Sequence, residues 1–223
     1  MSKRVFVCLA GIDGSGKSTV SSEVLKKLDG YKYVWARWEP FFLKPFIQLL
    51  NKKTNRTAGS RTDESVYANK KGIKKKILRS QFIKQTWLFL AECDYFLQLT
   101  LKVCVPALLS KKILCDRYIY DFYVDQLINI EKSPQQLLRF IQRRMLSVFP
   151  KPDLLFYIKI SPETGHRRKK DGTSVAYLKE RKEYYDSLKT LYKTVEIDGE
   201  ENLEVVVDKV YKEISLIGSE GCE

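Results

Sequence analysis

The sequence has little of what metal-binding and membrane proteins need. Its 223 residues include one histidine and five cysteines, and no two cysteines are spaced as C-x-x-C. A structural zinc site is therefore not expected. No stretch of 18 or more consecutive apolar residues occurs, so we expect no membrane-spanning helix. The first apolar run begins at residue 5, which leaves no room for a signal peptide, and we expect a cytoplasmic protein.

Acidic residues are also scarce, with 27 Asp and Glu against 40 Lys and Arg. The excess is uneven, because ten basic and only two acidic residues lie between Lys52 and Arg79. A segment of this charge can bind nucleic acid or another polyanion. It lacks the interleaved aromatic residues of a base-stacking platform. We therefore interpret residues 51–76 as a solvated, flexible loop and do not expect nucleic acid as a partner.

The pattern of apolar residues indicates an α/β fold. Short apolar runs alternate with stretches of helical periodicity, which is typical of a parallel sheet covered by helices on both faces. The length suits one domain spanning residues 1–223. Five strands are predicted, at Val5–Ala10, Tyr33–Arg37, Ile113–Cys115, Leu154–Ile160 and Thr194–Ile197. Helices are predicted over Ser18–Leu28, Phe42–Leu50, Ile77–Leu109, Pro134–Phe149, Pro162–Arg168, Ala176–Leu191 and Leu203–Leu216.

A glycine-rich loop follows the first predicted strand. Residues Gly11–Thr19 read G-I-D-G-S-G-K-S-T and match the phosphate-binding pattern G-x-x-x-x-G-K-[ST]. An apolar strand precedes the loop and a helical pattern follows it, which is the context that this motif requires. The sequence therefore predicts a P-loop fold with three α/β/α layers, a five-stranded parallel sheet and a short lid.

Each residue type in this loop has a physical role. Glycines allow tight turns that bring backbone N–H groups against phosphate oxygens, and the N-terminus of the following helix adds its positive dipole end. Lys17 is expected to reach the β- and γ-phosphates of ATP, and Ser18 to bind Mg²⁺. The predicted nucleotide-binding residues are Gly11, Asp13, Gly14, Ser15, Gly16, Lys17, Ser18 and Thr19.

Charged residues end two other predicted strands. Asp116 and Arg117 follow Ile113–Cys115, and Arg37 ends the strand Tyr33–Arg37. Ligands of open α/β sheets bind at the carboxyl ends of the strands. Asp116 is expected to hold Mg²⁺ through water. Two arginines that face a phosphate loop suggest that the second substrate also carries a phosphate.

Three motifs together resemble the thymidylate kinase family of nucleoside monophosphate kinases. They are the loop at 11–19, D-R-Y at 116–118, and K-P-D-L-L-F-Y-I-K-I-S-P-E-T at 151–164. The resemblance extends from Arg4 to Ile214. It implies ATP- and Mg²⁺-dependent phosphoryl transfer to a nucleoside monophosphate, with dTMP converted to dTDP. Family members are commonly dimers through long apolar helices, a role that Ile77–Leu109 would suit.

The resemblance also implies roles for individual residues. Asp13 matches the acidic residue near the acceptor sugar, and Phe89 matches the aromatic residue that stacks on the acceptor base. Arg117 of D-R-Y contacts phosphoryl groups in the family, and Tyr118 beside it is placed at the substrate. Arg168 matches the arginine near the donor adenine. Lys17, Asp13, Arg117 and Arg168 are the predicted catalytic residues.

The lid is expected at about residues 167–176. The phosphate loop contains no arginine, and family members of this kind bring basic residues from the lid. The candidates are Arg167, Arg168, Lys169, Lys170 and Arg181. Closure of such a lid would exclude water and bring cations to the transferring phosphoryl group.

The sequence departs from the family at the position that reads the base. The family has an arginine there, whereas this chain has Cys93 between Glu92 and Asp94. Cys93 and Asp94 are therefore assigned to a changed acceptor pocket, although Glu92 and Asp94 could instead pair with the basic segment. The identity of the acceptor is left open by the sequence. One alternative is a kinase of another nucleotide, a nucleoside or a sugar, in which Asp13, Glu92 or Asp94 could serve as base for a hydroxyl. An ATP-dependent nucleic-acid-binding protein is another.

Overall fold

A computed structural model describes residues 4–45, 48, 67–68, 71–72, 75–76, 78–109, 112–145, 147–169, 171, 173–191 and 193–219. Most of the predicted basic loop, the end of the predicted helix Phe42–Leu50, and Lys170 of the predicted lid lie outside these residues. Within the described part, no helix is long and apolar enough to cross a membrane.

Five parallel strands form one sheet, as predicted. They are β1 (Val5–Ala10), β2 (Tyr31–Trp35), β3 (Lys112–Asp116), β4 (Leu154–Lys159) and β5 (Thr194–Asp198), in the order β2-β3-β1-β4-β5. Strand β2 begins and ends two residues before the predicted Tyr33–Arg37. In the register of the sheet, Asp116 is opposite Leu9 on one side and Trp35 on the other. The ends of these three strands therefore meet where the phosphate loop begins.

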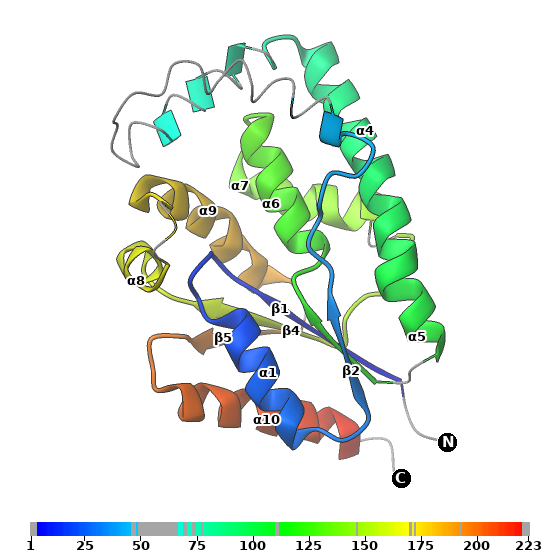
Figure 1. Ribbon diagram of the computed structural model, residues 1–223, viewed down its shortest axis with the longest axis vertical. Helices are drawn as coiled ribbons and strands as arrows, with labels where there is room; N and C mark the ends of the chain where they lie inside the picture. The colour runs from blue at the N-terminus through cyan, green and yellow to red at the C-terminus, as the bar shows by residue number, and fades with distance from the viewer. Residues whose placement is uncertain are drawn as a thin grey trace.

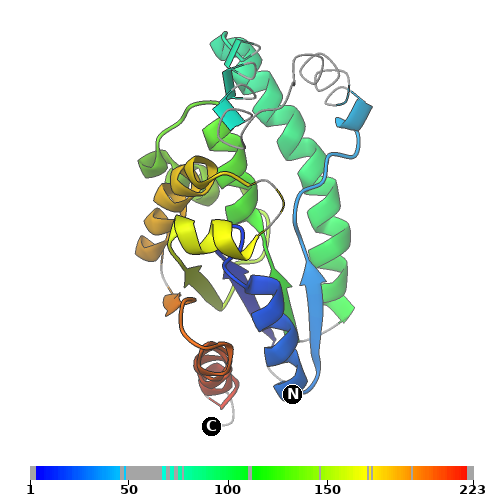
Figure 2. The same cartoon turned by 60° about the vertical axis from the view of Figure 1, so that its left-hand side comes forward.

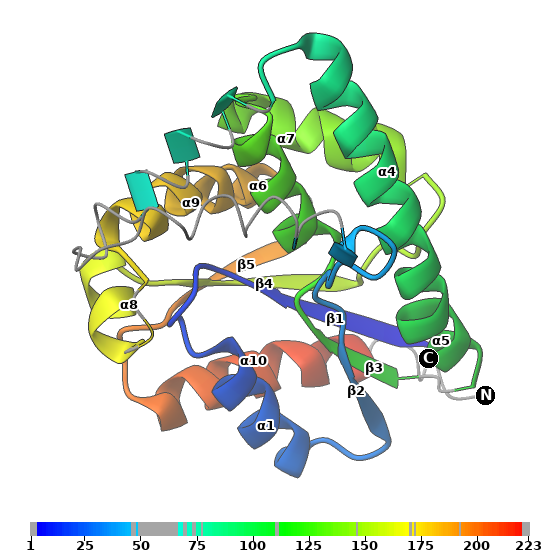
Figure 3. The ribbon, with the colours of Figure 1, turned by 45° about the horizontal axis from the view of Figure 1, so that its top comes forward.

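Helices cover both faces of the sheet (Figure 1). Helices α1 (Lys17–Lys27) and α10 (Leu203–Ser219) lie on one face. The other face carries α4 (Gln81–Leu99), α6 (Ile119–Asn129), α7 (Pro134–Phe140) and α9 (Val175–Ser187). Figure 3 shows the two sets on opposite sides of the strands. This arrangement is the three-layer P-loop fold that the sequence predicts.

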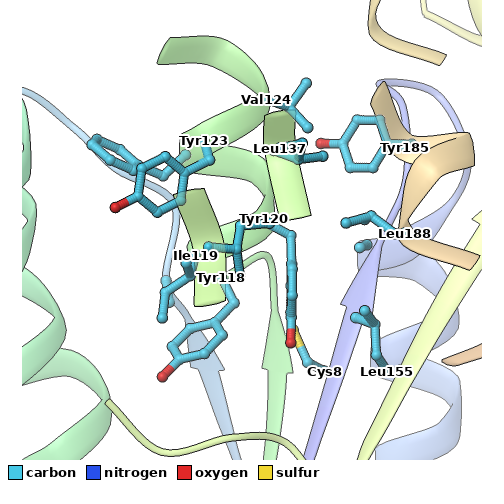
Figure 4. Packing of buried hydrophobic residues seen from close by; sticks show 14 of the residues in the cluster. Cys8, Tyr118, Ile119, Tyr120, Tyr123, Val124, Leu137, Leu155, Tyr185 and Leu188 are labelled. Atoms are coloured by element: carbon cyan, nitrogen blue, oxygen red, sulfur yellow. The ribbon is translucent and has the colours of Figure 1, made fainter. Parts of the chain in front are cut away.

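Alternation along β1 divides the core into two clusters. Val5, Val7 and Leu9 pack with α1 and α10, whereas Phe6 and Cys8 pack with the helices of the other face. Successive residues of a strand point to opposite faces, and a strand in the middle of a covered sheet is therefore apolar throughout. In the cluster that contains Phe6 and Cys8, side chains of α6 and α9 converge on β1 and β4 (Figure 4).

The predicted helix Ile77–Leu109 is one nearly continuous element. Helix α4 passes into a π-helical turn, Thr100–Cys104, and then into α5 (Val105–Leu109). Figure 2 shows this element along one side of the molecule, next to β2.

The other predicted helices differ from the observed ones mainly at their ends. The helix predicted over Pro134–Phe149 is α7 followed by a π-helical turn that ends at Met145. Helix α8 (Pro162–Arg168) has the predicted bounds.

Helix α6 is the element that the sequence patterns missed. Nine of its eleven residues are buried, and its polar face is only a narrow stripe at Asp121, Asp125 and Asn129. This helix matters for the site, because it directly follows Arg117 and Tyr118.

Candidate active site

The phosphate loop is shaped by glycines that no other residue can replace without strain. Gly14 has a φ of 82°, and a Cβ atom there would lie 2.5 Å from the carbonyl oxygen of Gly165 in α8. Gly16, with a φ of 86°, directly precedes α1, and a Cβ atom there would meet nothing within 4 Å. Within the described residues, no side chain caps the first N–H groups of α1. An uncapped helix N-terminus suits an anion.

Lys17 lies at the centre of the loop. Its Nζ donates to the carbonyl oxygens of Gly11 (2.7 Å) and Ile12 (2.8 Å) and to Ser15 Oγ (3.1 Å). Burial, assisted by the nearby Arg117, lowers the pKa of Lys17 from about 10.5 to about 8. The ammonium group is thus held among loop oxygens, at the place where the motif requires a cation.

Ser18 and Asp116 place two side-chain oxygens next to each other beside the loop. Ser18 Oγ donates to Asp116 Oδ2 over 2.6 Å, and the Tyr33 hydroxyl donates to the same oxygen over 3.2 Å. Asp116 Oδ1 is buried and has no hydrogen-bond partner among the described residues. A buried carboxylate oxygen without a partner, next to a hydroxyl, fits a hard cation such as Mg²⁺. No cluster of three or more acidic, His or Cys ligands occurs among the residues described, so further ligands would have to be phosphate oxygens or water.

Arg117 lies between two carboxylates. Its backbone has a left-handed φ of 64°. Its guanidinium contacts Asp13 Oδ1 through Nη2 and Asp121 Oδ1 through Nη1, the latter at 3.1 Å. Burial alone would raise the pKa of Asp13, but the charges of Arg117 and Lys17 together lower that pKa far below its ordinary value. Asp13 is therefore ionised throughout the neutral pH range.

A small polar pocket opens in front of Asp13 and Arg117. Arg37 and Arg181 also line it, so three arginines from separate segments converge there. The sequence predicted this place for two of them, Arg37 and Arg117. Arg181 donates through Nε (3.0 Å) and Nη2 (2.7 Å) to Asp125 Oδ1. Its guanidinium carbon lies 3.4 Å from the centre of the Tyr177 ring. The remaining lining residue is Tyr185.

A second pocket lies on the other side of the loop. It is lined by Ser15, Gly16, Thr19, Val20, Arg168, Gly199, Glu201, Leu203 and Val206. Arg168 Nη1 donates to the carbonyl oxygen of Gly199 over 2.9 Å, which fixes the guanidinium at the edge of this pocket. The structure thus brings Arg168 and Thr19 together next to the loop, on the side where the donor base is expected.

Two of the predicted lid cations line the pockets, Arg181 the first and Arg168 the second. Lys169 Nζ lies 3.6 Å from Asp13 Oδ2 and 2.8 Å from Asp171 Oδ2. Arg167 is directed toward Thr164 Oγ1 at 3.4 Å, within its own helix. Of the lid candidates within the described residues, Lys169 and Arg181 lie nearest to the groups around Asp13.

Two predicted acceptor residues do not face the site. Phe89 is 60% exposed, and Cys93 is exposed as well. The buried positions of α4 are Lys84, Leu88, Ala91, Asp94, Tyr95 and Leu99. Residues 89 and 93 fall on the opposite side of a helix with 3.6 residues per turn. Phe89 and Cys93 therefore belong to the outer surface, and the assignment of a base-stacking ring to Phe89 is corrected.

Two further acceptor assignments are corrected because the side chains are engaged in the fold. Tyr118 is fully buried, and its hydroxyl donates to the carbonyl oxygen of Pro150 over 3.0 Å. Figure 4 shows its ring within the core cluster. Asp94 accepts from Trp38 Nε1 and from the backbone N–H groups of Phe41 and Phe42. Its carboxylate holds the segment that follows β2.

Within the described residues, Glu92 does not pair with the basic segment. Glu92 accepts from the Tyr123 hydroxyl at 2.8 Å and from Arg144 Nη1 at 2.6 Å. In the described part of the basic segment, Lys71 pairs with Glu180 and Lys75 with Glu131. Neither Glu92 nor Asp94 is therefore available as a catalytic base.

Sequence reasoning missed four side chains around Arg117 and Arg181. These are Asp121 and Asp125 on α6, and Tyr177 and Tyr185 on α9. The two carboxylates are four residues apart and the two tyrosines eight, so each pair lies on one face of its helix. This spacing could have shown that each pair shares a helix face. It could not be used for Asp121 and Asp125, because no helix was predicted at α6.

Comparison with known proteins supports the resemblance. No protein-family model matches the chain. A thymidylate kinase of Leptospira interrogans is 29% identical over 220 residues, covering 93% of this chain and 92% of that protein. A thymidylate kinase of Mycoplasmoides gallisepticum is 25% identical over 229 residues, covering 97% and 96%. A probable thymidylate kinase of Methanosarcina barkeri is 29% identical over 206 residues, covering 91% and 86%.

Solved structures share the fold. Thymidylate kinase from Candida albicans aligns with a TM-score of 0.53 at 21% identity, covering 97% of this chain and 94% of that one. A deoxyadenosine kinase from M. mycoides, solved with dCMP and dCDP, aligns with a TM-score of 0.56 at 18% identity, covering 94% and 98%. The resemblance to thymidylate kinases therefore holds over nearly the whole chain, and the P-loop kinase fold is confirmed.

Proposed function

We propose that this chain, a nucleotide kinase and a divergent relative of the thymidylate kinases, transfers the γ-phosphoryl group of ATP to a nucleoside monophosphate. The first candidate acceptor is dTMP. The observation that carries the proposal is the convergence of Arg37, Arg117 and Arg181 on one pocket beside the phosphate loop. Arginine forks bind phosphate oxygens through paired N–H groups. A nucleoside or sugar acceptor would bring no anion to this group of cations.

Phosphoryl transfer needs positioning and charge neutralisation more than covalent chemistry. Lys17 and the N-terminus of α1 would hold the donor phosphates, and Arg168 would lie beside the donor base. Ser18 and Asp116 would hold Mg²⁺, which neutralises charge on the phosphates when it is bound. Arg37 and Arg117 would hold the acceptor phosphate in line. A phosphate oxygen needs no strong base, and Asp13 would orient the acceptor.

We also propose that the chain forms a homodimer through the outer face of α4 and α5. Large apolar side chains are exposed there over nearly the whole element. They are Phe82, Ile83, Phe89, Leu90, Phe96, Leu97, Leu101, Val105, Leu108 and Leu109. A continuous apolar surface of this kind is typical of a protein–protein interface. This face also contains Phe89 and Cys93, which explains why they are absent from the pocket.

An ADP-release assay with ATP and Mg²⁺ tests the main proposal. The acceptors are dTMP, dUMP, UMP, CMP, AMP, GMP, thymidine and several sugars, and the inactive control is Lys17→Ala. Turnover with a monophosphate but not with the matching nucleoside supports the proposal. Turnover with thymidine or a sugar would instead make Asp13 the base of a hydroxyl kinase. ATP hydrolysis stimulated only by polynucleotide would favour the nucleic-acid-binding alternative.

A further inference from the structure

Helices α6 and α9 are joined by a buried polar contact at the edge of the pocket, which Tyr185 also lines. The Tyr185 hydroxyl donates to Asp121 Oδ1 over 2.6 Å. The same carboxylate oxygen accepts from Arg117 Nη1 at 3.1 Å. Asp121 and Tyr185 are 4% and 3% exposed, so water competes little with these contacts.

The two carboxylates that contact Arg117 are not equivalent. Asp13 lines the acceptor pocket and is also approached by the Tyr177 hydroxyl at 3.5 Å and by Lys169 at 3.6 Å. Asp121 is not among the residues that line this pocket. Asp13 is thus free to change partners when an acceptor enters, whereas Asp121 is enclosed by the protein.

The backbone at Arg117 does not by itself fix the guanidinium. The residue adopts a left-handed conformation with a φ of 64°, and a long side chain leaves it with several rotatable bonds. A guanidinium fork discriminates by direction, because its N–H groups point along fixed lines in one plane. With an enclosed carboxylate on Nη1, Nη2 is directed toward the pocket, where it contacts Asp13.

We propose that Asp121 and Tyr185 are positioning residues that fix the Arg117 guanidinium for binding the acceptor phosphate. Asp121 holds one edge of the guanidinium, and Tyr185 holds the carboxylate of Asp121 in turn. This inference rests on the proposed function, because it assumes that Arg117 binds a phosphate. It adds two residues, from helices on either side of Arg117, to the acceptor site.

The chain offers a matched pair of tyrosines for the test. Tyr184 and Tyr185 are adjacent on α9 and similarly buried, but the Tyr184 hydroxyl donates to the carbonyl oxygen of Lys132. Tyr185→Phe and Tyr184→Phe each remove one buried hydroxyl and keep the ring. The Tyr185 ring also stacks on Tyr157, a contact that the phenylalanine preserves.

We expect Tyr185→Phe to lower kcat/KM for the monophosphate acceptor about tenfold, with the affinity for ATP unchanged. Tyr184→Phe should keep the wild-type kcat/KM, even if the two variants have the same lowered melting temperature. Asp121→Asn should lower kcat/KM for the acceptor more than tenfold. The double variant Asp121→Asn with Tyr185→Phe should have the same kcat/KM as Asp121→Asn alone, because the two groups act through one contact. Equal kinetics for the two tyrosine variants, or additive losses in the double variant, would overturn the inference.

Equilibrium binding separates this inference from the proposed function. dTMP and UMP are titrated into the wild-type protein and both tyrosine variants without ATP. If the wild type binds a monophosphate but transfers no phosphoryl group to any acceptor, the proposed function fails. The inference then stands if Tyr185→Phe alone weakens binding, and it falls if both variants bind alike. If the wild type binds no monophosphate, both are wrong.

Discussion

Ser18 Oγ lies 2.6 Å from Asp116 Oδ2, although 98 residues separate the two in the chain. The contact joins the start of α1 to the end of β3, the neighbour of β1 in the sheet. Within the described part of the chain, the other oxygen of Asp116, Oδ1, is buried and has no partner. A cation bound at this place would meet an oriented hydroxyl and an oriented carboxylate, which reduces the cost of ordering its ligands.

The first prediction concerns the dependence of activity on Mg²⁺. Asp116→Asn and Ser18→Ala should each raise the Mg²⁺ concentration for half-maximal turnover, by about 10- to 100-fold, because an oriented oxygen ligand or its partner is lost. Mg²⁺ titration at fixed ATP measures this shift. Ser21→Ala is the control: Ser21 lies one turn further along α1, and its buried hydroxyl has no hydrogen-bond partner. An unchanged half-saturation in Asp116→Asn would remove Asp116 from the metal site.

The second prediction concerns pH. The pKa of Lys17 is lowered to about 8 in the folded chain from about 10.5. Between pH 8 and 10.5 the unfolded chain therefore binds more protons at this residue, and its contribution to stability rises with pH. Lys17→Met should lack that rise, as urea unfolding at pH 7.5 and pH 10 without nucleotide would measure. Tyrosines that titrate in this range cancel in the difference between the wild type and the variant.

The affinity for ATP should fall as pH rises, whereas the contribution of Lys17 to stability rises. Loss of the Lys17 charge removes a cation from the donor phosphates, so ATP binding to the wild type should weaken as pH rises above about 8. Lys17→Met should bind ATP weakly at every pH in this range. A wild-type affinity that stays constant to pH 10 would contradict this assignment of the Lys17 pKa.

The residues whose place in the fold the sequence predicted well are those fixed by local geometry. Gly14, Lys17 and Ser18 occupy a contiguous loop, and Asp116 and Arg117 end a central strand, so strand order alone brings them together. Residues on helices were predicted less well. A shift of two positions turns a side chain by about 200° on a helix, which separates exposed Phe89 from Trp87, whose Nε1 donates inward to Gln126.

Tyr118 shows a second limit of the sequence. It adjoins Arg117 in one motif, yet Arg117 faces the pocket and Tyr118 faces the core. The left-handed backbone at Arg117 turns the chain sharply between strand and helix, and the positive φ of a non-glycine residue is not visible in a sequence. The contact of Asp121 with Tyr185 depends on how helices α6 and α9 pack together, and a sequence does not show that packing.

The third prediction concerns the segment after β2. Asp94 is 2% exposed and accepts hydrogen bonds from three N–H groups, one of Trp38 and two of the backbone at Phe41 and Phe42. Asp94→Ala should lower the free energy of unfolding by about 3 kcal/mol, because it leaves these donors without a partner. Urea unfolding measures the loss. Asp208→Ala, which removes an exposed carboxylate, should leave the midpoint almost unchanged. A stable Asp94→Ala protein would show that the segment has other support.

The fourth prediction concerns the apolar outer face of α4 and the turn that follows it. Phe89 and Leu101 are 60% and 61% exposed, and they belong to a row of exposed apolar side chains that runs from Phe82 to Leu109. If this face joins two chains, a carboxylate placed in it would be buried without a partner in both copies. Phe89→Glu and Leu101→Glu should each raise the dimer dissociation constant by about 100-fold or more, which light scattering across a dilution series would measure. Leu216→Glu introduces the same charge at a side chain of similar exposure on α10 and should leave the dimer intact. A wild-type chain that stays monomeric at high concentration, or equal effects of the three variants, would show that this face does not join two copies.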